Sequence, residues 1–331
     1  RSEVVTRRTS DVAADMVSLL LEAQRGRTSV PMKPNVRRIL PQPSINQAGV
    51  PAMRHPGRGH MRRILAVVAL LVVLSATPAL AITYGDLDEE KHPQVGLMVA
   101  FDDKGTPMWS CSGTMISERV YLTAGHCTYD ADSIQIWFDA DVEDGMPGNG
   151  FGKDGGWTGD VSGKPYTHYA YDQGPWWLAD VGVVKLDPSG PVGPGPYAEL
   201  PLEGELDKFA EKPRKDKVWF TAVGYGMQRS FRNQLNWKNS SPHIRMYSEP
   251  KLIQINVPGY TGDRNLILSN NTRTGGTCFG DSGGPNFLRG GLKIAGITSF
   301  GKNGQCAGQG GVLRLDHPVI RDWVMEQLGD D

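Results

Sequence analysis

Thr277-Cys278-Phe279-Gly280-Asp281-Ser282-Gly283-Gly284-Pro285 is the stretch on which the interpretation of this chain depends. Its serine lies between glycines, directly after an acid and four residues after a cysteine. Glycines allow a sharp turn that presents the hydroxyl, and the N–H groups of such a turn can stabilise an oxyanion. Far upstream, Thr123-Ala124-Gly125-His126-Cys127 again places a histidine next to a cysteine. The two motifs together predict a nucleophilic serine with a histidine base.

The order of the candidate residues separates two classes of hydrolase. Gly280-Asp281-Ser282-Gly283-Gly284 also fits the Gly-x-Ser-x-Gly elbow of the α/β-hydrolases. That fold needs its acid and its histidine after the serine, and only His317 follows Ser282. The other order, histidine then acid then serine, is met by His126, Asp180 and Ser282. With both motifs intact, most of the chain resembles the chymotrypsin/trypsin-like serine peptidases.

This resemblance implies an all-β fold of two six-stranded antiparallel β-barrels, with the active site in the cleft between them and a C-terminal α-helix. It also implies a catalytic triad, in which His126 takes the proton of Ser282 and Asp180 fixes the tautomer of the imidazole. The oxyanion hole implied by the family is formed by the backbone N–H groups of Gly280 and Ser282.

Of the three triad residues, the acid is the one for which the sequence offers several candidates. Asp180 precedes the apolar run Val181–Leu186, as the family's acid precedes its strand. Asp187 lies beyond that run, and Asp160 and Asp172 lie in polar loops. Asp180 is therefore the predicted acid.

The resemblance also places a primary specificity pocket. The position six residues before the serine forms its floor, and here it is Gly276, with Thr277 beside it. An acid there would select Lys or Arg, whereas this uncharged pocket predicts apolar or aromatic side chains before the cut. The segment 306–312, which supplies the last wall residue, is one residue shorter than usual in the family. The walls map to Ser299, Phe300, Gly301 and Gly311.

Four cysteines allow three pairings. Locality and the family favour Cys111–Cys127, around the strand before the histidine, and Cys278–Cys306, which joins the serine loop to the pocket wall. Each bridge closes a loop of about 15–30 residues, worth roughly 3 kcal/mol by the chain-entropy estimate.

The N-terminal part has a different composition. Residues 1–60 are rich in Arg and are expected to be a disordered or non-native extension, with translation starting at Met61. Residues 61–81 read as a signal peptide: a basic start, the apolar run 64–74 and an Ala-x-Ala end. The run is too short for a membrane anchor. Cleavage after Ala81 would leave residues 82–331 as a secreted peptidase domain.

Cleavage would also expose a new amino terminus at Ile82. In the family this ammonium folds inward and pairs with the acid before the nucleophile, here Asp281. We therefore expect an Ile82–Asp281 ion pair that forms without a separate activation step. An α-amino group titrates near pH ~8, so activity should fade in alkali.

Short β-rich runs separated by Gly, Pro, Asn and Asp begin at Gln94 and indicate a barrel or sandwich. The connector 188–201, rich in Pro and Gly, is expected between an N-terminal barrel at about 82–187 and a C-terminal barrel and helix at about 202–331. The glycine-rich segment 141–163 is expected to be a long surface loop near the cleft. A terminal helix should begin after an Asp316 N-cap. The predicted strands are 95–101, 120–123, 134–138, 181–186, 218–224, 252–257, 293–300 and 311–315.

Composition limits the partners. The formal charge is −1 overall, but residues 82–331 carry 23 Lys and Arg against 32 Asp and Glu, giving −9 and no reason to expect nucleic acid. Acids at 139–144 do not fit a calcium loop, because the glycine is out of register. We expect a monomer without metal or cofactor, free of the membrane after signal cleavage, with protein or peptide substrates and protein inhibitors as partners. The alternatives are a non-catalytic binding protein on this fold and an esterase.

Overall fold

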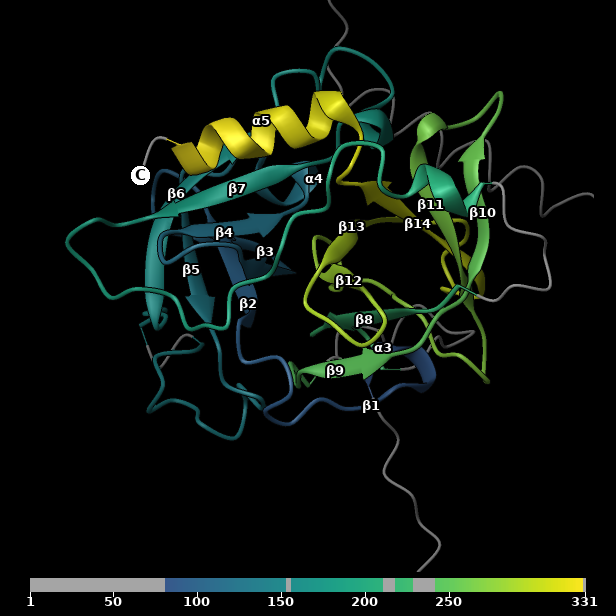
Figure 1. The fold of residues 1–331 in the computed structure, drawn as a ribbon. Coiled ribbons are helices and arrows are strands. Elements are labelled where there is room, and N and C mark those ends of the chain that lie inside the picture. Colours follow the sequence, from purple (N-terminus) through teal and green to yellow (C-terminus); the bar gives the residue numbers. More distant parts are fainter. Residues whose placement is uncertain (1–80, 153–155, 211–217, 229–241, 330–331) are drawn as a thin grey trace, which may run out of the picture. The chain divides into compact units, whose positions relative to one another are not determined.

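The computed structural model describes residues 81–329, except 153–155, 211–217 and 229–241. The predicted extension, residues 1–60, and residues 61–80 of the predicted signal peptide lie outside the described residues. The described part is built mainly of antiparallel β-strands with one long helix at its C-terminal end (Figure 1). The predicted all-β class is therefore confirmed.

The first half is the predicted six-stranded barrel. Its strands close in the order β2-β3-β4-β7-β6-β5, and all neighbours are antiparallel. Every side chain of β2 and β4 is buried, which explains why their apolar runs could be recognised in the sequence. The strands are β2 (Val95–Phe101), β3 (Pro107–Met115), β4 (Val120–Thr123), β5 (Ser133–Trp137), β6 (Val161–Thr167) and β7 (Gly182–Leu186).

The second half is a half-barrel of eight strands in the order β1-β9-β8-β12-β13-β14-β11-β10, where a six-stranded barrel was expected. The two additional strands extend the edges: β1 joins through Asp86 opposite Tyr247, and β10 joins through Leu252 opposite Leu268. The strands are β1 (Asp86–Leu87), β8 (Phe220–Gly224), β9 (Met246–Ser248), β10 (Leu252–Val257), β11 (Gly262–Asn270), β12 (Pro285–Leu288), β13 (Ile294–Gly301) and β14 (Gly308–Arg314).

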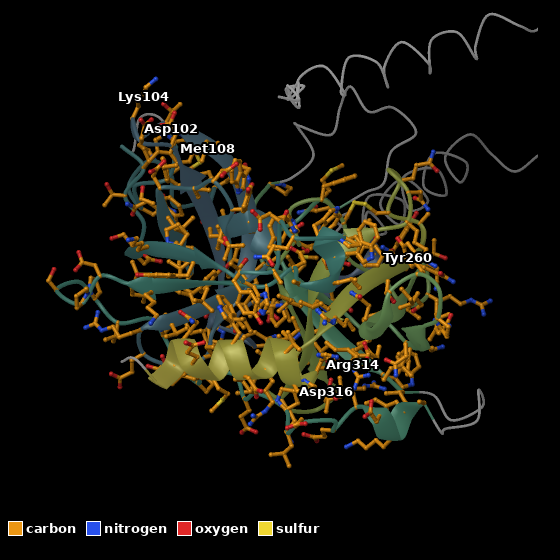
Figure 2. The ribbon with its side chains drawn as sticks, turned by 90° about the horizontal axis from the view of Figure 1, so that it is seen from above. Asp102, Lys104, Met108, Tyr260, Arg314 and Asp316 are labelled. Carbon is orange, nitrogen blue, oxygen red and sulfur yellow. A yellow bond between two sulfur atoms is a disulfide. The ribbon has the colours of Figure 1, made fainter. Side chains whose placement is uncertain are left out.

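The terminal helix α5 (Pro318–Gly329) packs on the first barrel, beside β6 and β7 (Figure 1). Its buried face holds Ile320, Trp323 and Val324, which belong to the same apolar core as the barrel. Asp316 does not cap this helix as predicted. Its buried carboxylate accepts hydrogen bonds from Arg314 and from the Leu206 N–H (Figure 2).

Residues 188–201, expected to be the connector and all of them described, contain neither strand nor helix. The glycine-rich segment differs from expectation, because part of it folds inward. Val142 and Phe151 are buried, and Phe151 packs edge-on against Trp137 of β5. Among the described residues, no helix has the length and apolar character needed to cross a membrane.

Candidate active site

Two paired strands bring His126 and Asp180 together. His126 lies in the short helix α4 (Gly125–Thr128), which begins two residues after the last residue of β4, and Asp180 lies two residues before the first residue of β7. Because β4 and β7 are antiparallel, with Thr123 opposite Gly182, the end of one strand meets the start of the other. His126 and Asp180 are 54 residues apart in the sequence, and this strand pairing brings them within hydrogen-bonding distance.

The Asp180 carboxylate is fully buried and is held by three donors. The His126 Nδ1 lies 2.9 Å from Oδ2, and the backbone N–H of His126 donates to Oδ1 at 2.8 Å. The hydroxyl of Ser299 donates to Oδ2 at 2.5 Å. Donors of this kind stabilise a buried carboxylate, and the carboxylate in turn fixes the ring tautomer. The sequence had placed Ser299 only in the pocket wall, so its contact with the acid was missed.

The rival acids make other contacts. Asp160 accepts a hydrogen bond from the Phe138 N–H, and burial raises its pKa. Asp187 accepts from both the N–H and the hydroxyl of Ser189, which lowers its pKa. Asp172 interacts with Tyr129. The structure thus brings Asp180, the predicted acid, to His126.

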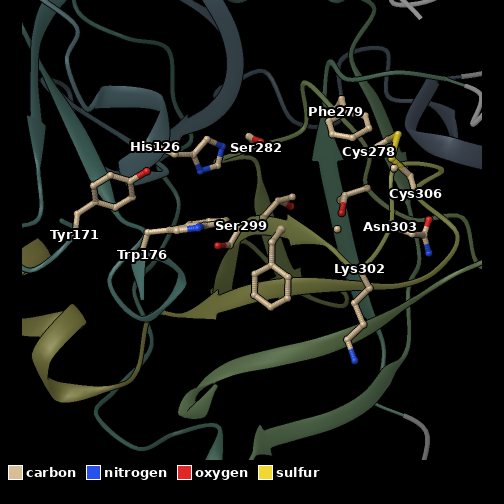
Figure 3. A pocket seen from close by; sticks show the side chains of 15 residues that line it. His126, Tyr171, Trp176, Cys278, Phe279, Ser282, Ser299, Lys302, Asn303 and Cys306 are labelled. Atoms are coloured by element: carbon tan, nitrogen blue, oxygen red, sulfur yellow. A yellow bond between two sulfur atoms is a disulfide. The ribbon is translucent and has the colours of Figure 1, made fainter. Parts of the chain in front are cut away.

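Ser282 and His126 line the same cavity, which has a volume of about 510 Å³ (Figure 3). Figure 3 labels both side chains in this view of the cavity. Ser282 belongs to the turn before β12 in the second half, whereas His126 belongs to the first barrel. The cavity therefore lies between the two halves, as the resemblance implied.

The turn before Ser282 leaves two N–H groups free. Gly280 has a φ of 94°, a conformation that glycine adopts without strain, and the Phe279 carbonyl accepts a hydrogen bond of 2.8 Å from the Met227 N–H. The N–H groups of Gly280 and Ser282 donate to no acceptor among the described residues. Unpaired backbone donors beside a hydroxyl are the feature that an oxyanion hole requires.

The acid of the same turn is buried without a cation among the described residues. The two carboxylate oxygens of Asp281 accept hydrogen bonds of 2.8 Å from the N–H groups of Gly226 and Cys278. Burial nevertheless raises its pKa to about 7. The predicted partner, Ile82, is fully buried, and its neighbour Thr83 bridges to Gly276, but the nitrogen of Ile82 is here an amide joined to Ala81.

Comparison with known proteins agrees with this geometry. The model of the trypsin family matches residues 86–324. This chain belongs to the trypsin family of serine proteases. It is 24% identical over 239 residues to serine protease 1 of Drosophila melanogaster, covering 71% of this chain and 80% of that protein. It is also 24% identical over 245 residues to the collagenase of Hypoderma lineatum, and the match covers 71% of this chain and 82% of that protein.

Solved structures share the fold. The HL collagenase structure has a TM-score of 0.55 at 21% identity and covers 75% of this chain and 99% of that chain. Human heparin binding protein has a TM-score of 0.52 at 18% identity, and the match covers 76% of this chain and 98% of that chain. At these identities the likeness concerns the fold alone.

Within this trypsin-family fold, four of the six predicted pocket residues line the cavity: Thr277, Ser299, Phe300 and Gly301. Gly276 and Gly311 do not, because each packs against a neighbouring side chain. A Cβ atom added to Gly276 would lie 2.3 Å from Asn270, and one added to Gly311 would lie 2.2 Å from the ring of Phe300. The missed lining residues include Tyr171, Trp176, Thr298, Lys302 and Asn303.

Gly310, the residue before Gly311 in β14, does not line this cavity either. A Cβ on Gly310 would approach the Thr277 hydroxyl at 3.4 Å. The bulge between Thr298 and Phe300 shifts the pairing of β13 with β14 by one residue. The short segment 306–312 was the signal in the sequence that such a shift occurs.

Both predicted disulfides are present, Cys111–Cys127 and Cys278–Cys306. Among the described residues, the group of three possible metal ligands is Cys111, His126 and Cys127. Two of these are joined in a disulfide, and the histidine is bonded to Asp180, so the group does not fit a metal ion.

Proposed function

We propose that this chain is a secreted serine endopeptidase that cleaves peptide bonds through an acyl-enzyme intermediate. The single observation that supports this best is the composition of the cavity rim. It combines the Ser282 hydroxyl, an imidazole bonded to a buried carboxylate, and two unpaired N–H groups. Each of these groups has a role in acyl transfer and no evident structural purpose there.

In the proposed reaction the Ser282 hydroxyl oxygen attacks the substrate carbonyl while His126 Nε2 takes the hydroxyl proton. Asp180, bonded to Nδ1, stabilises the imidazolium. The N–H groups of Gly280 and Ser282 bind the oxyanion. The C–N bond then breaks as His126 returns the proton to the leaving amine. Water, activated by the same imidazole, releases the acid and restores Ser282.

We propose apolar or aromatic side chains before the cut. The aromatic rings of Phe300 and Trp176 line the cavity, and no Asp or Glu is found among its lining residues, all of which are described. Lys302, which does line it, would repel a Lys or Arg side chain. Protein or peptide substrates follow from membership of the family.

The test is labelling of the secreted protein by a fluorophosphonate, together with hydrolysis of peptide anilides that have Phe, Leu, Lys or Arg before the bond. Labelling and hydrolysis should both disappear in Ser282→Ala. Asp180→Asn should keep the structure and lower kcat by about 10⁴-fold, because the imidazole takes the wrong tautomer. A folded wild-type protein that is neither labelled nor active would instead be a binding protein on this fold. Faster cleavage after Lys or Arg would contradict the proposed specificity.

A further inference from the structure

Ser112 of β3 contacts both residues of the proposed oxyanion hole. Its side chain is fully buried, and its hydroxyl donates a hydrogen bond of 2.8 Å to the Gly280 carbonyl. The same hydroxyl oxygen accepts the Tyr225 N–H at 2.9 Å. Its backbone N–H donates to the Ser282 carbonyl at 2.8 Å. One residue of the first barrel thus holds the serine turn of the second half at two points.

These contacts fix the peptide groups on both sides of the Gly280 Cα. The carbonyl before it, that of Phe279, is held by the Met227 N–H, and the carbonyl after it is held by the Ser112 hydroxyl. In a planar trans peptide the N–H points away from the carbonyl, so holding the Phe279 carbonyl directs the Gly280 N–H the opposite way. A glycine at φ 94° has no side chain that would restrict rotation. The hydrogen bonds are therefore what keeps this N–H in its orientation.

We propose that Ser112 is a positioning residue for transition-state stabilisation: its buried hydroxyl holds the Gly280–Asp281 peptide, which limits rotation of the Gly280 backbone and so keeps the Gly280 N–H directed at the site where the oxyanion forms. This inference rests on the proposed peptidase function. The residue touches no substrate, so its effect passes through Gly280. Without the hydroxyl, the Gly280 carbonyl and the Tyr225 N–H lose this common partner, and the turn gains freedom to rotate toward other partners.

The test compares Ser112→Ala with the wild-type enzyme on a peptide anilide. Loss of one oxyanion donor lowers kcat by about 10²–10³-fold, so a donor that is misdirected for part of the time should lower kcat by roughly 10–100-fold. KM should change less than twofold, because the contact acts mainly in the transition state. A peptide aldehyde, whose adduct places an oxygen in the hole, should bind more weakly by a factor similar to the loss in kcat. The corresponding peptide alcohol should bind as before.

Ser117→Ala is the matched control. The Ser117 hydroxyl accepts the Val120 N–H at 3.0 Å in the turn that follows β3, away from the cavity. This variant should lose some thermal stability and keep its kcat. An unchanged kcat and aldehyde affinity in Ser112→Ala, with stability lowered as in the control, would make Ser112 merely structural and overturn the proposal. General unfolding of Ser112→Ala under conditions where Ser117→Ala is folded would also overturn it.

Hydrogen exchange separates this inference from the proposed function. Amides in residues 277–285, and the Tyr225 amide that loses its acceptor, should exchange at least 10-fold faster in Ser112→Ala, while exchange elsewhere in the chain is unchanged. That measurement needs no catalysis. Wild-type protein that hydrolyses nothing and is not labelled would refute the peptidase function. Unchanged exchange in an active enzyme would refute the role of Ser112 alone.

Discussion

Asn270 fills the space that a side chain at position 276 would need. Its amide group donates to the Thr277 carbonyl, and its carbonyl oxygen accepts a hydrogen bond of 2.8 Å from the Thr83 hydroxyl. Gly276 lies against this side chain, with no room for a Cβ atom. Three segments therefore meet at Gly276, and the glycine is required for their close approach.

This packing predicts that Gly276→Asp will not convert the enzyme to Lys or Arg specificity. The new Cβ would meet Asn270 at 2.3 Å, and the carboxylate would be buried without a cation, so we expect a loss of at least about 2 kcal/mol in unfolding free energy. Thr277→Asp is the matched variant. Because Thr277 lines the cavity, the carboxylate of an aspartate introduced there would face the substrate. Denaturant unfolding measures the stability of both variants, and hydrolysis of peptide anilides measures their specificity. Efficient Lys or Arg cleavage by a stable Gly276→Asp protein would contradict this account.

The chemical role of a residue could be predicted where that role requires a particular side chain in a recognisable sequence pattern. His126 and Ser282 were predicted from motifs and Asp180 from its place before an apolar run; the structure brings His126 and Asp180 into contact and places Ser282 in the same cavity as His126. Ser112 could not be found, since nothing in the sequence shows that its hydroxyl meets a carbonyl 168 residues away. Gly311 was misplaced because a bulge changes the register, and a one-residue shift moves a side chain to the other face.

At the scale of elements, the glycine-rich segment after β5 belongs to the barrel core more than to the cleft. Phe151 is 7% exposed and packs edge-on against both Trp137 and Trp157. None of the described residues of 141–163 lines the cavity. The described part of this segment therefore does not form a wall of the cavity.

Phe151→Ala should accordingly lower stability without changing catalysis. Removing a buried phenyl ring costs about 3 kcal/mol, and the loss should appear in denaturant unfolding. The kcat and KM on a peptide anilide should stay within twofold of wild type at a temperature where both proteins are folded. Tyr169→Ala, which removes an aromatic ring that is 63% exposed, is the control and should change stability little. A rise in KM for Phe151→Ala alone would show that the segment does contact substrate.

Strands were predictable from the sequence where β-branched and other apolar residues dominate a short run. The runs 95–101, 120–123 and 252–257 agree with β2, β4 and β10 as the structure has them, although β10 also contains Gln254 and Asn256. β3 was missed because its outer half, which includes Met108 and Ser110, is exposed or half-buried and mixed in character. β6 was missed because Gly163 and Pro165 are typical of turns; here they pair within the closed barrel.

At the scale of the whole described domain, the segment before β2 is part of the second half. Asp88 and Arg245 form a fully buried ion pair at 3.0 Å, and Arg245 also donates to the Phe138 carbonyl of the first barrel. β1 pairs with β9, and Ile82 is buried against Met246. The residues that follow the predicted cleavage site are therefore already docked in the uncut chain, which makes the charge of Ile82 the main change that cleavage would bring.

Cleavage after Ala81 should therefore change how stability depends on pH. In the uncut chain the pKa of Asp281 is about 7, above its ordinary value of about 4 in an unfolded chain. The folded state thus keeps a proton that the unfolded state releases, so this group's contribution is complete below pH ~4 and is lost as the pH rises through 7. A free Ile82 ammonium paired with Asp281 would lower that pKa and remove the loss, until the ammonium itself titrates above pH ~8.

The measurement is denaturant unfolding at pH 5, 6, 7 and 8 for a chain that starts at Ile82 and for one that retains residues before it. Between pH 5 and 7 the extended chain should lose more stability than the chain that starts at Ile82. His168, whose pKa is lowered by burial, contributes equally to both and cancels in the comparison. Asp281→Asn should remove the difference, since an amide does not titrate. Equal slopes for the two wild-type chains would mean that the ammonium does not reach Asp281, and the buried carboxylate would then be held by the N–H groups of Gly226 and Cys278.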